Sequence, residues 1–325
     1  MYWFREINIP ALLLYVSLTA AWAIGGWLLV NYAFRLRPSE RLISGIAAGC
    51  ILFITLGNLF APLMPLPASF SLAAVLILAA GLASGWAARK TRPLPLSDLK
   101  NWPQLVAFFS LIVIFAMIQR GLALFDDYLH LPLVSTMAAG DIPPHFYLNP
   151  DFRFTYHYAL QVWAASMVRM AGLFPWSAWD LSKAVMIALT LMLGWVWVKR
   201  LTKSAFLASL GSALFTFGGG TRWLLLLLPN PILSRLQTGI QLINSGADSG
   251  ATLAQALAGP WVIEGTGVMP FPFAFHNGVF IPVLFMLGST GALMYVTVLL
   301  LLLLVPRQRL TVLGIIILGL ILANL

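Results

Sequence analysis

Charged residues and cysteine are both scarce in this chain of 325 residues. Only 9% of its residues are charged, whereas soluble domains carry about a quarter. The single cysteine, Cys50, lies inside an apolar run, which excludes an intramolecular disulfide and a thiolate metal site. The long apolar runs hold almost no ionisable residues, although ion-coupled transporters and proton relays usually place carboxylates or histidines near the membrane midplane. The composition therefore argues against ion-coupled transport.

Apolar residues are abundant instead, and they are grouped in runs long enough to cross a lipid bilayer. They make up 60% of the chain, and the mean hydropathy is +0.91. Because about 20 helical residues cross the hydrocarbon layer, we predict an all-α polytopic bundle of about eight or nine transmembrane helices. The predicted spans are residues 9–34, 42–61, 69–88, 103–119, 181–198, 204–217, 278–304 and 310–325.

The basic residues fall in four clusters between these runs, and their placement predicts an orientation. An excess of Lys and Arg in cytoplasmic loops explains the net charge of +9 better than nucleic-acid binding does, so we expect no nucleic-acid partner. With all four clusters in the cytoplasm, loops 120–180 and 218–277 face the outer side. The clusters are Arg35, Arg37 and Arg41; Arg89, Lys90, Arg92 and Lys100; Lys199, Arg200 and Lys203; and Arg307 and Arg309.

The orientation also decides how one further apolar stretch is interpreted. Residues 156–173 would place the next basic cluster outside if they crossed the membrane. Their polar positions Gln161, Ser166 and Arg169 instead predict a helix in the membrane plane, with one face toward water. The chain then divides into three parts. Residues 1–103 form N-terminal helices, residues 104–203 form a central unit with the first outer loop, and residues 204–325 form C-terminal helices with the second outer loop.

Two carboxylates and an imidazole, Asp126, Asp127 and His130, directly follow a predicted span. Ionisable groups are costly near hydrocarbon, so this cluster is a candidate site. We expect a short helix over 131–139, with its proline in the first turn and Gly140 as its stop. A carboxylate at such a helix start stays ionised, which favours a general base, while simple capping is the alternative. The spacing also lets all three side chains share a divalent cation, Mg²⁺ or Mn²⁺, although a fourth ligand is missing.

A second group of polar and aromatic side chains lies at residues 151–158. Arg153 can hold phosphate oxygens in a bidentate fork, and aromatic faces such as that of Tyr156 pack on sugar rings. With His157 beside them, this segment predicts binding of a sugar or a phosphate. The alternative is an aromatic belt in which Arg153 reaches lipid headgroups.

These features resemble the first outer loop of the GT-C superfamily of integral membrane glycosyltransferases, particularly its bacterial polytopic members. The likeness covers residues 104–203. It consists of an aspartate after a spanning helix, then a short helix, Gly-Asp-Ile-Pro-Pro at 140–144, Tyr-His-Tyr at 156–158, Gly172, and a next helix that begins near Asp180 to Lys183.

The resemblance implies many transmembrane helices with juxtamembrane helices in the first outer loop. It also implies transfer of a sugar from a polyprenyl-phosphate donor to an acceptor on the outer face of a bacterial cytoplasmic membrane. The catalytic base would be Asp126 or Asp127, of which we favour Asp126, and the expected partners are the lipid-linked donor and membrane lipids. Two other functions stay open: binding or transport of a lipid or polyprenyl phosphate, and a non-catalytic subunit of a membrane complex.

The second outer loop adds residues that the implied reaction can use. Arg222 follows the glycines at 218–220, whose amides can form an anion-binding nest, while a flexible helix break is the alternative. His276 follows alternating Pro and Phe residues and is a candidate for binding the donor phosphate, with a structural hydrogen bond as the alternative. Glu264 is a second candidate for the general base.

The chain departs from the family in two respects. Three helices precede the pair that carries the motif, and the chain ends at Leu325 inside an apolar run, without the soluble C-terminal domain that the resemblance implies. We therefore expect either that the chain is a fragment or that donor and acceptor are selected without such a domain.

Overall fold

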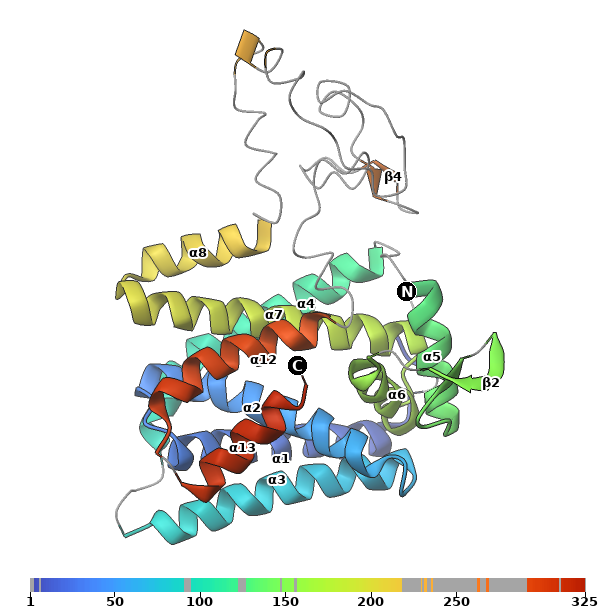
Figure 1. Ribbon diagram of the computed structural model, residues 1–325, viewed down its shortest axis with the longest axis horizontal. Helices are drawn as coiled ribbons and strands as arrows, with labels where there is room; N and C mark the ends of the chain where they lie inside the picture. Colours follow the sequence, from blue (N-terminus) through green and yellow to red (C-terminus); the bar gives the residue numbers. More distant parts are fainter. Residues whose placement is uncertain are drawn as a thin grey trace.

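The computed structural model describes most of the chain as one helical bundle (Figure 1). Five described helices are long and apolar enough to cross a membrane. They correspond to α1 (Ile9–Ala33), α2 (Pro38–Phe60), α3 (Leu66–Ala88), α4 (Trp102–Gly121) and α7 (Pro175–Thr202). The described residues are 3–5, 7–90, 95–121, 127–146, 148–154, 157–217, 291–309 and 311–324, with isolated residues and short pieces at 229, 231–232, 235, 262–263 and 267–268.

The remaining described elements are shorter. The shorter α-helices are α5 (Asp127–Ala139), α6 (Ala159–Ala171), α8 (Ala205–Phe217), α12 (Gly291–Leu304) and α13 (Val312–Leu322), and η1 (Leu96–Asn101) and η4 (Val305–Arg307) are 3₁₀ turns. Two antiparallel pairs supply the strands: β1 (His145–Phe146) with β2 (Asn149–Arg153), and β3 (Val262–Ile263) with β4 (Gly267–Val268). The predicted helical bundle is confirmed, with these small strand pairs as additions.

The predicted spans differ in how completely they are found. The first four and the span at 181–198 coincide with the five long helices, although α7 begins six residues before the predicted start. The last three coincide with α8, α12 and α13, which are shorter than a span. The eleven residues of α13 rise only about 16 Å, roughly half the hydrocarbon thickness. Residues 278–290 of the predicted seventh span lie outside the described residues.

Glycines allow α1, α2 and α3 to pack with their backbones almost in contact. A Cβ atom at Gly26 of α1 would collide with the backbones of Gly45 and Gly49 of α2. The neighbouring Gly25 faces α3 in the same way, because a Cβ atom there would lie 2.6 Å from the carbonyl carbon of Ile77. Small residues four apart are a common means of close helix packing in membranes. The Gly25–Gly26 pair thus joins α1 to both of its neighbours.

We predict that Gly49→Ala destabilises the protein by about 1–3 kcal/mol, because the added methyl group would overlap the carbonyl oxygen of Trp22. The measurement is thermal unfolding of the purified chain in a mild detergent. Gly194→Ala in α7 is the matched control, since its Cβ atom would have open space around it and alanine favours helix. Equal unfolding temperatures for the two variants would contradict this role of Gly49.

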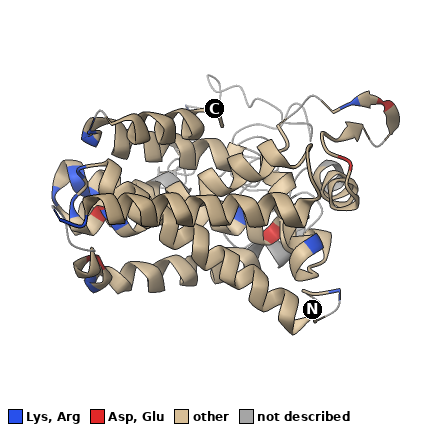
Figure 2. Cartoon of the chain, turned by 90° about the horizontal axis from the view of Figure 1, so that it is seen from below, with Lys and Arg blue, Asp and Glu red and all other residues tan. Residues whose placement is uncertain are grey.

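The basic clusters meet at one end of the bundle, which we call the basic end (Figure 2). Hydrogen bonds join its segments: Arg35 N donates to the carbonyl oxygen of Arg307 at 2.7 Å, and the Asn101 side chain donates to the carbonyl oxygen of Pro38 at 3.3 Å. Asp98 of η1 is fully buried there and accepts from the indole of Trp27 at 3.2 Å. Segments far apart in the sequence are therefore fixed side by side at this end.

A buried ion pair between α2 and α7 is the strongest of these connections. Arg200 donates from Nε and Nη2 to the two carboxylate oxygens of Glu40, each at 2.9 Å, and from Nη1 to the carbonyl oxygen of Leu303 in α12. The side chains are only 10% and 4% exposed. The bidentate geometry and the third hydrogen bond to Leu303 compensate for removing both charges from water. The pair ties together α2, α7 and α12.

We predict that Glu40→Gln lowers the free energy of unfolding by about 3–5 kcal/mol, because Arg200 then stays buried without a counter-charge. Removing both charges, with Glu40→Met and Arg200→Met together, is expected to restore most of that loss. The unfolding temperatures of the single and double variants in detergent measure the difference. A double variant no more stable than Glu40→Gln would show that the charge imbalance is not the cause.

Candidate functional site

The candidate site lies where α5, α6 and the beginning of α7 pack together, at the end of the bundle opposite the basic end (Figure 1). Gly172 ends α6 in a left-handed conformation with φ of 69°, and Pro175 starts α7 three residues later. The N-terminal segment crosses this turn: Arg5 N donates to the carbonyl oxygen of Gly172, and Phe174 N donates to that of Trp3. The turn between α6 and α7 is thereby fixed against the chain start.

Helix α5 begins earlier than the sequence predicts. We expected a helix over 131–139, but it starts at Asp127, so Pro132 lies inside the helix and not in its first turn. The stop at Gly140 is confirmed, with φ of 111°. Because the predicted base Asp127 is the first residue of the helix, its backbone lies one turn before His130. The side chain of Asp127 and the whole of Asp126 lie outside the described residues.

His130 is buried between α6 and α7. Its side chain is 2% exposed, and Nδ1 lies 2.9 Å from Nε2 of Gln161 in α6. The ring also contacts that of Trp179 in α7, with 4.8 Å between centroids. With the amide oriented in this way, Gln161 donates to Nδ1 of the tautomer that carries its proton on Nε2. The contacts with Gln161 and Trp179 fix the orientation of the ring.

Gln161 leaves one polar atom unsatisfied in this arrangement. Its Oε1 is buried and has no hydrogen-bond partner among the described residues. A 180° rotation of the amide would let Oε1 accept a proton from Nδ1 of the other His130 tautomer, or of the imidazolium. The pair is therefore able to hold His130 in either protonation pattern without moving the ring.

Asp180 and Lys183 place opposite charges in the interior of α7. The Lys183 side chain is fully buried, and its Nζ lies 3.7 Å from Oδ1 of Asp180, whose side chain is 6% exposed. Nζ also lies 5.4 Å from the centroid of the Trp179 ring. The indole of Trp179 thus contacts both His130 and Lys183. We call these five residues, His130, Gln161, Trp179, Asp180 and Lys183, the buried polar cluster.

The hairpin β1–β2 carries other predicted residues and lies outside this cluster. Asp141 accepts from His145 N at 2.8 Å and contacts its Nδ1 at 2.7 Å, which holds the chain between α5 and β1. Arg153 ends β2 with an exposed side chain, close in sequence to the exposed Phe152. The described structure therefore places Arg153 on the surface, outside the buried polar cluster.

The remaining predicted residues have different outcomes. His157 is exposed just before α6. Tyr156, Arg222, Glu264 and His276 lie outside the described residues, so their proposed roles stay predictions. No group of three metal-ligating side chains occurs in the described part of the chain, and His130 already uses Nδ1 for Gln161. Two of the three predicted metal ligands fall outside that part, and the described residues alone supply no metal site.

Helix α6 does not have the water-facing surface that its sequence predicts. We expected its polar residues to point at water, but Gln161 and Ser166 are both fully buried and only Arg169 is exposed. Ser166 donates to the carbonyl oxygen of Trp163, while the Trp163 indole donates to the Tyr15 hydroxyl of α1 at 3.0 Å. The polar positions are therefore satisfied inside the protein, and contacts with α1, α2, α3, α5 and α7 cover the helix.

Sequence reasoning missed four of the five residues of the cluster as candidates. The sequence pattern marks Asp180 and Lys183 only as the start of the next helix, although Lys183 lies inside the span predicted at 181–198. A charged pair spaced three residues apart in an apolar helix is a usable signal, because such residues face one another on a helix and are costly near lipid. Gln161 and Trp179 carry no comparable signal, since their role depends on contacts between helices.

Comparisons with protein families, curated proteins and solved structures give no match to this chain. The family suggested by the first outer loop therefore rests on the residues alone.

We predict that Asp180→Asn destabilises the protein by about 3 kcal/mol, because it leaves the buried Lys183 ammonium without its nearby carboxylate. Adding Lys183→Met to that variant is expected to recover part of the stability. A double-mutant cycle of unfolding temperatures in detergent gives the coupling between the two charges. Asp151→Asn in the exposed strand β2 serves as the control and should change nothing. Additive effects of the two substitutions would contradict the pairing.

Proposed function

We propose that this protein is a membrane glycosyltransferase that moves a sugar from a polyprenyl-phosphate donor to an acceptor hydroxyl at the membrane surface. The observation that supports this most directly is the position of α5, which begins at Asp127 and leads within one turn to the buried polar cluster. The backbone of Asp127 is thereby one turn from a side chain that packs inside the bundle. A polyprenyl tail can stay in the bilayer only if its sugar phosphate reacts at the membrane surface.

The orientation is part of the same proposal. Cytoplasmic loops carry the excess of Lys and Arg, so the basic end would face the cytoplasm and the α5–α6 end the outer side of a bacterial cytoplasmic membrane. The donor would then be used on the outer face. The resemblance of residues 104–203 to GT-C enzymes implies the same location.

The reaction needs a base and a means of stabilising the departing phosphate. The carboxylate of Asp126 or Asp127 takes the proton of the acceptor hydroxyl as its oxygen bonds to the anomeric carbon. The bond between that carbon and the phosphate oxygen breaks, and polyprenyl phosphate leaves with the electron pair. A cation close to the phosphate favours this step. Arg153 is suited to it, because its guanidinium is exposed at the end of β2.

The buried polar cluster would act on this site by positioning. The ring of His130 is fixed by Gln161 and Trp179, and this holds the first turns of α5 against α7. Exposed Leu148 and Phe152 on the hairpin give Arg153 apolar neighbours of the kind found at the membrane interface.

We predict that membranes containing the full chain transfer radiolabelled sugar from polyprenyl-phosphate donors to lipid-extractable or protein acceptors. Asp126→Asn or Asp127→Asn, whichever removes the base, is expected to lower the rate by about 100-fold or more at equal expression. Lys100→Gln is the control, because it removes an exposed charge at the basic end, away from α5, and should keep the rate.

Two results would contradict the proposal in different ways. Unchanged transfer in both aspartate variants would remove the base assignment. No transfer by the wild-type protein, with polyprenyl phosphate still bound, would favour the binding or transport function instead.

A further inference from the structure

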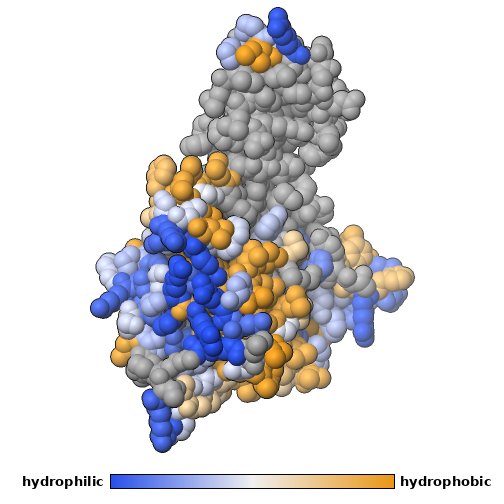
Figure 3. Space-filling view, turned by 60° about the vertical axis from the view of Figure 1, so that its left-hand side comes forward, coloured by the Kyte–Doolittle hydropathy of each residue, from blue (hydrophilic) through white to orange (hydrophobic). Residues whose placement is uncertain are grey.

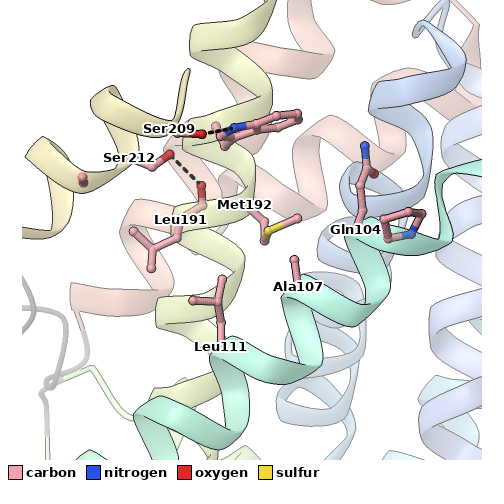
Figure 4. Close-up of a pocket in the computed structure, with 10 residues that line it drawn as sticks. Gln104, Ala107, Leu111, Leu191, Met192, Ser209 and Ser212 are labelled. Carbon is pink, nitrogen blue, oxygen red and sulfur yellow. Dashed lines mark hydrogen bonds between the residues drawn. The ribbon is translucent and has the colours of Figure 1, made fainter. Parts of the chain in front are cut away.

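Two adjoining pockets at the basic end have complementary chemistry. One is an apolar groove of about 460 Å³ between α4, α7 and α8 (Figure 4). The other is a smaller pocket of about 160 Å³ lined by the basic ends of α2 and α7. They share Trp195 as a common wall. Gln104 of the groove donates to the carbonyl oxygen of Ser39 of the basic pocket at 2.8 Å, which fixes the two pockets beside each other.

The groove is mostly apolar, and the polar groups of Trp195, Ser209 and Ser212 in its lining form hydrogen bonds within the protein. The Trp195 indole donates to Oγ of Ser209 at 3.3 Å, and Ser212 Oγ donates to the carbonyl oxygen of Leu191 at 3.4 Å (Figure 4). Leu111 and Met192 line the part of the groove between α4 and α7. An occupant of the groove therefore needs an apolar chain without hydrogen-bonding groups.

The basic pocket presents positive charge that no described acidic side chain neutralises. Glu40 and Arg200 in its wall form an ion pair with each other. The other cations, Arg37, Lys199 and Lys203, form no ion pair with any described residue, and Lys199 Nζ lies 4.4 Å from the ring centroid of Trp195. The space-filling view of this end shows hydrophilic side chains directly beside apolar surface (Figure 3). An occupant therefore needs an anionic group.

We propose that the two pockets together bind one anionic glycerophospholipid, with its phosphate among Arg37, Lys199 and Lys203 and one acyl chain along the groove. Charge complementarity selects this occupant, because a zwitterionic lipid would bring a cation of its own beside Arg37, Lys199 and Lys203, and an apolar helix of another protein would bring no anion. Basic pockets between membrane helices commonly hold such headgroups.

This lipid site is separate from the proposed transferase site. Trp195 lies twelve residues after Lys183 on the same helix, a rise of about 18 Å. The two sites therefore lie toward opposite ends of α7, and a lipid bound at Trp195 would not be the sugar donor. Its binding is measurable without any transfer reaction, so the two proposals fail independently.

The test uses the full chain purified in a neutral detergent and titrated with phosphatidylglycerol or with phosphatidylcholine of the same acyl chains. Native mass spectrometry gives the bound fraction, and the unfolding temperature gives the stabilisation. We expect phosphatidylglycerol to bind more tightly. Replacing Lys199 by Gln and Lys203 by Asn, which tolerates the φ of 58° there, should weaken it by about 25-fold, or about fivefold for each lysine. Lys90→Gln with Lys100→Gln removes the same charge outside the pocket and should change the affinity less than twofold.

A third variant tests the groove. Ala107→Phe fills the groove from α4 and should weaken phosphatidylglycerol binding while the unfolding temperature of the lipid-free protein stays the same. Each of the following results would overturn the proposal: equal binding of the two lipids, equal losses in the two lysine pairs, full binding in Ala107→Phe, or equal protection by inorganic phosphate alone. A dimer that Ala107→Phe dissociates would assign the groove to a second copy of the chain and would also overturn it.

Discussion

The ion pair between Glu40 and Arg200 determines how α2 and α7 are aligned along the bundle. Because the guanidinium also binds the carbonyl oxygen of Leu303, a sliding movement of any of the three helices would break a buried charged hydrogen bond. Such a bond is costly to lose where water is excluded. The glycine contacts of α1 with α2 and α3 then carry this alignment to the N-terminal helices. The positions of both ends of α7 along the bundle follow from this alignment.

The buried polar cluster shows what the other end of α7 requires. A fully buried lysine in an apolar helix is stable only with a counter-charge close by, and Asp180 supplies it one turn earlier. Trp179 lies between this pair and His130, so it connects the charged turn of α7 to α5. An apolar core would pack α5 and α6 equally well. Packing alone therefore does not require ionisable groups at this end, and the proposed function gives them a role in positioning α5.

The sequence predicts the long helices well and the site only in part. Helices α1 to α3 are found within four residues of their predicted bounds, because apolar runs, prolines and arginines mark them. The start of α5 was misplaced because Pro132 was expected in a first turn, whereas packing on α6 and α7 extends the helix to Asp127. The contact of His130 with Gln161, 31 residues away, follows from no spacing rule, since it depends on how whole helices pack. The cluster forms only when α5, α6 and α7 pack against one another.

Helix α7 is long enough to reach from one surface of a bilayer to the other. Its 28 residues rise about 42 Å, which is the thickness of a bilayer with its headgroup layers. Asp180 and Lys199 are separated by a rise of about 28 Å along the helix, which nearly equals the ~30 Å hydrocarbon thickness, so the two charged positions fit at its opposite edges. A lipid phosphate held beside Lys199 would fix the depth of the basic end. The depth of the first residue of α5 would then follow from rigid packing against α7, with no contact of its own to the membrane.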